Sequence, residues 1–188
     1  MTNLYKFLRG IHPLSEACRD RLEDGLEFKR IRRKDHLLRA GQICSNIYFV
    51  ESGLLLNYYV KVGKTISSSF SSEGQICTSI RSFFDQDYGI DNIQALEDSA
   101  VYYLSKDQYQ SLCNQFHEFN TICRILLEKC IRDREERLAA MWMLPADRRW
   151  EWLVRVQPDL LQRVAAKHLS SYVGVTESMF SMIRKNEL

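Results

Sequence analysis

The chain has 188 residues, of which 45% are hydrophobic and 27% charged, and its formal net charge is +2. These proportions exclude a disordered chain, and no run reaches the ~18 apolar residues of a transmembrane helix. The N-terminal sequence lacks the apolar core of a secretory signal, so we expect a cytoplasmic protein with no membrane contact. The six cysteines form no C-x-x-C pair. Their spacing argues against a zinc ribbon or an iron–sulfur cluster and predicts reduced, mostly buried thiols.

Short strands are predicted for the first half of the chain. Leu14, Cys18 and Leu22 are spaced by four and indicate one face of a short preceding helix. A basic cluster at residues 29–34 follows, which we interpret as the solvated edge of a strand, with a nucleic-acid patch as the alternative. Short β-branched and aromatic runs separated by turns then predict an antiparallel roll or barrel. These runs are 47–50, 54–60, 65–70 and 101–104.

A long helix is predicted for residues 118–143, after a shorter helix that Ser105 caps. Its length of roughly 39 Å exceeds what a domain of this size needs for its own core. We therefore expect its apolar stripe to pack against a second copy of the chain in a symmetric dimer, rather than across the domain surface. Pro145 ends the helix. The expected interface residues are Phe119, Ile122, Leu126 and Cys130.

The sequence AKHLSSYVGVTESMFSMIR, which begins at Ala166, contains the sharpest functional pattern. Leu169 and Val173 lie on one helix face, and Gly174 permits the left-handed backbone that ends a helix. Thr176 caps the next helix, whose inner face carries Phe180. Two short helices joined by a tight glycine turn predict a helix-turn-helix, whose second helix enters the major groove of DNA.

The outer face of this motif supplies the candidate DNA contacts. Hydroxyl groups can reach base edges or phosphates, and a methionine can contact the thymine methyl group. Basic side chains are placed to meet phosphates, with a solvated positive face as the alternative. The candidates are Lys167, His168, Thr176, Ser178, Ser181, Met182, Arg184 and Lys185.

The chain resembles the Crp/Fnr family of bacterial transcription regulators over most of its length. The resemblance is carried by GQICSNIYFVESGLLLNYY, by SSEGQICTSI, which occupies the place of the family's phosphate-binding segment, and by IQALEDSAVYYLS and SYVGVTESMFSMIRK. It implies an α+β fold with an antiparallel, cyclic-nucleotide-binding-like β-roll, a long dimerisation helix and a small helical helix-turn-helix domain. The implied boundaries are 1–117 for the roll, 118–144 for the helix and 145–188 for the DNA-binding domain.

Two departures from the family pattern bear on specificity. Cyclic-AMP binders of the family carry a glutamate where this chain has Gln75, and an arginine for the cyclic phosphate where residues 88–91 have none. A buried phosphate without a cation is costly, so we expect an unknown effector other than cyclic AMP. Ser178 and Met182 replace a base-reading glutamate and arginine, so the DNA target should differ from the usual family site. The effector pocket is expected at Gly74, Gln75, Ile76, Cys77 and Arg81, of which Arg81 should be engaged by neighbouring acids at the surface.

The sequence therefore predicts a homodimeric, cytoplasmic transcription regulator. Its expected partners are double-stranded DNA and a second copy of itself, with RNA polymerase as a further candidate. Enzyme activity is not expected because no nucleophile–base pair can be assembled from the spacing. No P-loop and no histidine ligand spacing were found, so no cofactor or metal is predicted. The alternative is a small-molecule-binding module with a degenerate DNA-binding half that acts through a protein partner.

Overall fold

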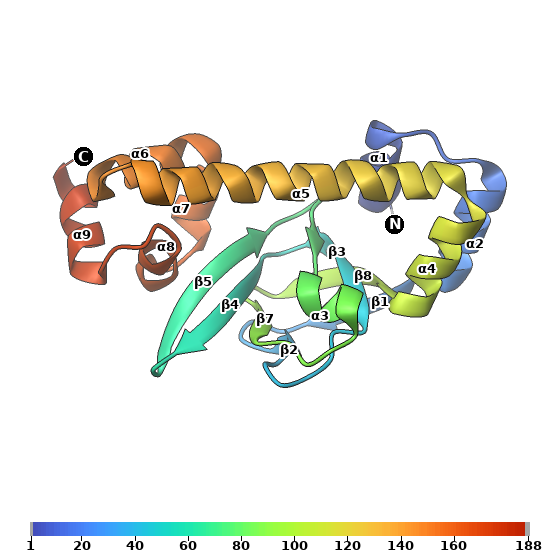
Figure 1. Cartoon of the computed structure of the whole chain (residues 1–188), viewed down its shortest axis with the longest axis horizontal. Coiled ribbons are helices and arrows are strands. Elements are labelled where there is room, and N and C mark those ends of the chain that lie inside the picture. Colours follow the sequence, from blue (N-terminus) through green and yellow to red (C-terminus); the bar gives the residue numbers. More distant parts are fainter. Residues whose placement is uncertain (1, 187–188) are drawn as a thin grey trace. The chain divides into compact units, whose positions relative to one another are not determined.

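The computed structural model describes residues 2–186, and the side chains of residues 3–183. By their contacts, the residues form two compact units, Met1–Asn57 with Phe70–Glu128, and Tyr58–Ser69 with Lys129–Leu188. Figure 1 shows the helices and strands. They are, in chain order, α1 (Thr2–Ile11), α2 (Glu16–Gly25), β1 (Glu27–Ile31), β2 (His36–Leu38), β3 (Asn46–Ser52), β4 (Leu55–Lys61), β5 (Lys64–Ser71), β6 (Ile76–Cys77), α3 (Ile80–Asp85), β7 (Asp91–Ala95), β8 (Ser99–Ser105), α4 (Lys106–Gln115), α5 (His117–Met143), α6 (Ala146–Val156), α7 (Leu160–Arg163), α8 (Ala166–Tyr172) and α9 (Glu177–Asn186).

The strands form two four-stranded sheets, in the orders β1-β8-β3-β6 and β2-β7-β4-β5. Strand β8 pairs antiparallel with both β1 and β3, and Lys29 lies opposite Val101. The predicted α+β fold with an antiparallel β-roll is confirmed, as are the four predicted strand runs. Lys29 and Arg30 are exposed on β1 at the edge of its sheet, as the interpretation of the basic cluster as a solvated strand edge predicts.

The core of the roll is built from buried side chains of both sheets. Val50, Leu55, Ile93 and Val101 are fully buried there, as expected for strands with one face on a core. The turn between β3 and β4 requires glycine at Gly53, where φ is +93° and a Cβ atom would lie 2.7 Å from the Cα atom of Ser99. Glycine alone avoids that overlap, so no other residue fits this position without a shift of the backbone.

A second core lies among helices α1, α2, α4 and the first turns of α5, which gather together in Figure 1. The Ser15 Oγ accepts a hydrogen bond from the Cys18 backbone N–H at 3.2 Å and so caps α2, which buries Cys18 and Leu22 as predicted. The predicted cap at Ser105 is confirmed, and it forms a reciprocal capping box with Gln108.

Helix α5 begins one residue before the predicted start and ends at the predicted residue. The C-terminal helices follow directly, since Pro145 stands at the start of α6. Trp150, Trp152 and Leu153 of α6 are buried, as expected for the core of a small helical domain. Among the described residues, no helix has the length and apolar character that crossing a membrane requires.

Candidate functional site

The segment expected to form the effector pocket is the turn between β5 and β6 and the start of α3. Gly74 adopts φ of +78° in this turn, and the Gln75 side-chain oxygen accepts a hydrogen bond from the Ser72 backbone N–H at 2.9 Å. Gln75 is exposed and closes its own turn, whereas Cys77 is buried in the roll and Ile76 is partly buried. Arg81 is 80% exposed and pairs with Asp85 at 3.8 Å, as predicted. The structure therefore places only the β6 part of this set toward the interior.

Inside the roll, polar groups of β4 and β6 satisfy one another. The Cys77 thiol donates a hydrogen bond to the Asn57 side-chain oxygen at 3.0 Å, and the Asn57 amide donates to the Thr78 carbonyl at 3.0 Å. Burial raises the pKa of Cys77 to about 12, so this thiol stays protonated and acts as a donor. The sequence pattern of short strands did not predict this buried hydrogen-bond network.

A carboxylate, rather than a cation, lies at the start of α3. The Ser79 hydroxyl donates a hydrogen bond to an Asp91 carboxylate oxygen at 2.5 Å, and Asp91 is only 8% exposed. Ser82 connects the same region, since its hydroxyl accepts from the Cys44 N–H at 2.8 Å and donates to the Asp87 carbonyl at 2.6 Å. A negatively charged ligand placed here would face a buried carboxylate, which is electrostatically unfavourable.

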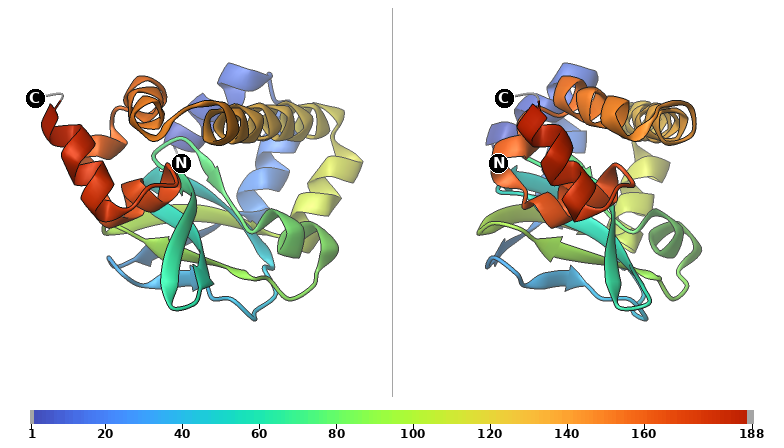
Figure 2. Two further views of the ribbon diagram at one scale, coloured as in Figure 1. Left: turned by 60° about the vertical axis from the view of Figure 1, so that its left-hand side comes forward. Right: turned by 90° about the vertical axis from the view of Figure 1, so that its left-hand side faces the viewer.

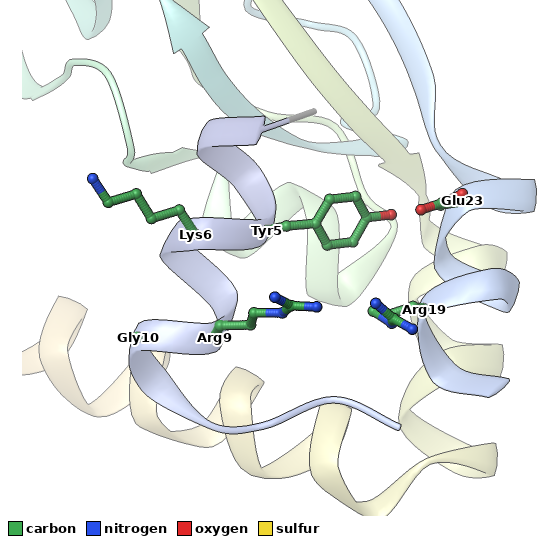
Figure 3. A pocket seen from close by; sticks show the side chains of 6 residues that line it. All are labelled: Tyr5, Lys6, Arg9, Gly10, Arg19 and Glu23. Carbon is green, nitrogen blue, oxygen red and sulfur yellow. The ribbon is translucent and has the colours of Figure 1, made fainter. Parts of the chain in front are cut away.

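A separate pocket of about 560 Å³ lies between α1 and α2 and was not predicted from the sequence. Figure 3 shows the guanidinium groups of Arg9 and Arg19 facing each other across it, and the Tyr5 hydroxyl pointing toward Glu23. Burial, together with the nearby Glu23 carboxylate, raises the pKa of Tyr5. The other lining residues are Lys6 and Gly10. The pocket has an excess of positive charge, and no residue of the β6–α3 segment lines it.

Helices α8 and α9 follow each other at a wide angle (Figure 2). Between them, Gly174 adopts φ of +69°, and the Val175 N–H donates to the Ser170 carbonyl at 3.0 Å. The Thr176 hydroxyl accepts from the Met179 backbone N–H at 3.2 Å, which is the contact of an N-cap residue. Phe180 is buried against Trp150, with ring centroids 5.0 Å apart in an edge-to-face arrangement. Each expected local element of the glycine-turn pattern is therefore present.

The predicted DNA-contacting side chains do not share one environment. Five are exposed, whereas His168 is half-buried. Burial and the charge of Lys167 lower the pKa of His168, which disfavours the charged imidazolium that would bind a phosphate most strongly. The predicted DNA contact of His168 stays a prediction. The side chains of Arg184 and Lys185 lie outside the described residues. The exposed candidates are Lys167, Thr176, Ser178, Ser181 and Met182.

The expected dimer residues of α5 require a correction. Phe119 and Ile122 are 5% and 1% exposed and belong to the core that α1, α2 and α4 form with the first turns of α5. They are therefore unavailable to a second chain, whereas Leu126 and Cys130 are half-buried. A row of exposed apolar side chains follows these residues along α5. The sequence did not predict this row, because spacing shows the period of a helix but not which of its faces the rest of the chain covers. The row comprises Leu127 at 37%, Ile131 at 61%, Leu138 at 39% and Trp142 at 75% exposure.

Comparison with known proteins gives a family match for part of the chain. Residues 28–116 match the family model of the cyclic nucleotide-binding domain. A comparison with curated proteins gives no match.

The whole fold is similar to that of solved bacterial regulators. The c-di-GMP-responsive global regulator CLP of Xanthomonas campestris has a TM-score of 0.72 at 16% identity, with 92% of this chain and 91% of that chain covered. CooA of Carboxydothermus hydrogenoformans has a TM-score of 0.74 at 17% identity, with 98% and 83% covered. A protein from Eubacterium rectale described within the crp/fnr family has a TM-score of 0.70 at 14% identity, with 92% and 83% covered. At these identities the similarity shows a shared fold, a cyclic-nucleotide-binding β-roll followed by a long helix and a helical C-terminal part.

Proposed function

We propose that this chain is a homodimeric, cytoplasmic transcription regulator of the Crp/Fnr type, without enzymatic activity, whose helix-turn-helix α8–α9 binds double-stranded DNA. The observation that carries the proposal is the combination of the Gly174 turn, the Thr176 cap and an α9 whose outer side chains are exposed. A helix held in this way can enter a major groove with its first turns leading. RNA polymerase remains a candidate partner of such a regulator.

The proposed DNA surface combines few charges with small polar groups. Lys167 on α8 supplies a phosphate contact, and Ser178 and Ser181 on α9 supply hydroxyl groups for base edges or phosphates. Met182 is 63% exposed, which is costly in water and favourable against a thymine methyl group. The Ser178 and Thr176 hydroxyls lie 3.1 Å apart and can share one phosphate oxygen. We therefore expect this surface to discriminate between bases in its DNA site more weakly than a surface with bidentate arginine contacts does.

The dimer is proposed to form along the exposed apolar row of α5. Leu127, Ile131 and Leu138 are separated by four and seven residues, so they share one face of a helix with a heptad-like period. Two such faces related by a two-fold axis bury each other and present the two α9 helices to half-sites ~34 Å apart. An effector bound to the roll would act by shifting the population of a DNA-competent dimer.

The effector is proposed to be something other than cyclic AMP. Asp91 is buried at the start of α3, and Arg81 is exposed and paired with Asp85, so the described interior offers a carboxylate where a cyclic phosphate needs a cation. Isothermal titration of the purified protein with cyclic AMP should therefore show no saturable heat at micromolar ligand. A dissociation constant in the micromolar range or below would contradict this prediction.

Replacing Lys167 by glutamine is expected to weaken DNA binding and lower its salt dependence. Each phosphate contact contributes about one unit to the slope of log affinity against log salt, so a dimer that loses two should lose about two units. The measurement is fluorescence anisotropy on a duplex selected from a random pool by the native protein, at several salt concentrations. The matched control is Lys29→Gln on the exposed edge of β1, which should leave affinity and slope unchanged.

Either of two results would contradict this proposal. If Lys29→Gln lowered the slope and Lys167→Gln did not, the basic cluster of residues 29–34 would be the nucleic-acid surface instead. If the native protein selected no duplex, or its affinity did not depend on salt, the module acting through a protein partner would be favoured.

A further inference from the structure

Two thiols on neighbouring helices lie close enough to react with each other. Cys113 is in the last turns of α4, and Cys123 is in the second turn of α5. Their sulfur atoms are 3.8 Å apart, and only Phe116 connects the two helices. Both cysteines are reduced. Neither has a part in the proposed DNA contacts, in the dimer row or in the β6–α3 segment.

The surroundings of this pair differ from those of the other buried thiols. Cys113 is half-buried and Cys123 is 8% exposed, so an outside reagent reaches Cys113 first. Lys106, at the start of the same helix, lies 4.9 Å and 4.7 Å from the ring centroids of Phe83 and Phe84. These cation–π contacts hold an ammonium group near the thiols.

Charge and hydrogen bonding favour a thiolate at Cys113. The hydrogen bond between Cys113 and Cys123, together with that to Tyr109 and the charge of Lys106, outweighs burial and lowers the pKa of Cys113 to about 7. The same hydrogen bond and burial raise the pKa of Cys123. At neutral pH the pair therefore combines one accessible thiolate with one protonated neighbour, which is the arrangement of an attacking and a resolving cysteine.

We propose that Cys113 and Cys123 form a reversible oxidation site for hydroperoxides, at which Cys113 attacks the peroxide and Cys123 resolves the product as an intramolecular disulfide. The 3.8 Å sulfur separation and the one-residue connection between the helices place the two thiols within reach of each other. A disulfide needs ~2.0 Å between sulfurs, so the last turn of α4 must shift slightly toward α5. Such a bond would fix the angle between α4 and α5 and, if the proposed dimerisation holds, restrain the helix that forms the dimer.

The chemistry balances with hydrogen peroxide as the oxidant. The Cys113 thiolate attacks one peroxide oxygen, so an S–O bond forms, the O–O bond breaks, and hydroxide leaves and takes up a proton as water. Sulfur is oxidised by two electrons to the sulfenic acid, and the peroxide is reduced. The Cys123 sulfur then attacks the Cys113 sulfur, so the S–S bond forms and the S–O bond breaks. The departing hydroxide takes the Cys123 proton, and a second water is released.

The full-length reduced protein should be treated with hydrogen peroxide, blocked with an alkylating reagent and digested with trypsin. Both cysteines lie on one tryptic peptide, residues 107–124, which contains no other cysteine. We expect this peptide to lose two hydrogen atoms and to escape alkylation, and dithiothreitol to restore both thiols. The Cys123→Ser variant should accumulate a sulfenic acid at Cys113 that dimedone captures. The Cys113→Ser variant should react at least tenfold more slowly at Cys123.

The control is Cys130→Ser, which removes a half-buried thiol from the same helix α5 and should form the disulfide as the native protein does. The oxidation rate should fall about tenfold per pH unit below pH 7, because the thiolate fraction of Cys113 falls by that factor. The proposal is overturned if peptide 107–124 keeps both thiols while other cysteines oxidise, if Cys113→Ser reacts as fast as the native protein, or if the disulfide joins Cys130 residues of two chains. The experiment measures the mass of a peptide, so a failure of the proposed DNA binding would not affect this test of the oxidation site.

Discussion

Replacing Ile131 and Leu138 together by glutamate is expected to convert the proposed dimer into monomers. Burying such a side chain contributes about 1–3 kcal/mol, and the two-fold axis doubles each contribution. The loss of dimerisation free energy is therefore roughly 4 kcal/mol or more. In addition, the four added carboxylates repel one another across the interface. The dissociation constant should rise at least about a thousandfold. Because both side chains are exposed in the single chain, at 61% and 39%, the fold of each monomer should persist.

Sedimentation velocity over a range of protein concentrations measures this change directly. The matched control is Ile90→Glu, which makes the same kind of substitution at a 69% exposed position between α3 and β7 and should stay dimeric. Far-ultraviolet circular dichroism establishes that the variants keep their helix content. The interface would have to lie elsewhere if the double variant sedimented with the native protein, or if Ile90→Glu became monomeric.

The elements that the sequence predicted correctly are those with a local cause. Ser105 precedes its helix as a hydrogen-bonding cap, and the strand runs carry β-branched and aromatic residues between turns. Gly174 supplies a positive φ between two apolar helices. In each case the physical reason is contained within a few neighbouring residues, so a single sequence is sufficient to find it.

The features that the sequence did not predict depend on contacts between distant segments. Phe119 and Ile122 have the spacing of a dimer seam, but α1, α2 and α4 cover them. Ser79 and Asp91 are twelve residues apart and meet only after the roll closes. The Cys113–Cys123 pair also requires the turn between α4 and α5. Spacing gives the period of a helix but not its covered face, so these assignments need the folded chain.

Replacing Arg137 by alanine is expected to destabilise the unit that contains α8 and α9. The Arg137 guanidinium donates to the Tyr172 carbonyl at 2.8 Å and to the Ser67 carbonyl at 3.3 Å, and its centre lies 4.3 Å from the centroid of the Tyr172 ring. It therefore satisfies the C-terminal end of α8 and joins it to β5, where the Ser67 N–H also donates to the Ser171 hydroxyl at 2.9 Å. Charged hydrogen bonds contribute about 1.5–3 kcal/mol and a desolvated cation–π contact about 1–2 kcal/mol.

The expected loss for Arg137→Ala is about 3 kcal/mol of the free energy of unfolding. Urea denaturation followed by tryptophan fluorescence reports this unit selectively, because all three tryptophans lie within Lys129–Leu188. Arg134→Ala removes an exposed arginine one turn away on the same helix and should cost less than about 0.5 kcal/mol. Arg137→Lys keeps the charge but cannot donate to both carbonyls while it lies over the ring, so it should fall between the two. Equal urea midpoints for Arg137→Ala and Arg134→Ala at one protein concentration would show that the contacts of Arg137 contribute no stability. The position of α8 would then depend on the packing of Leu169 and Phe180 alone.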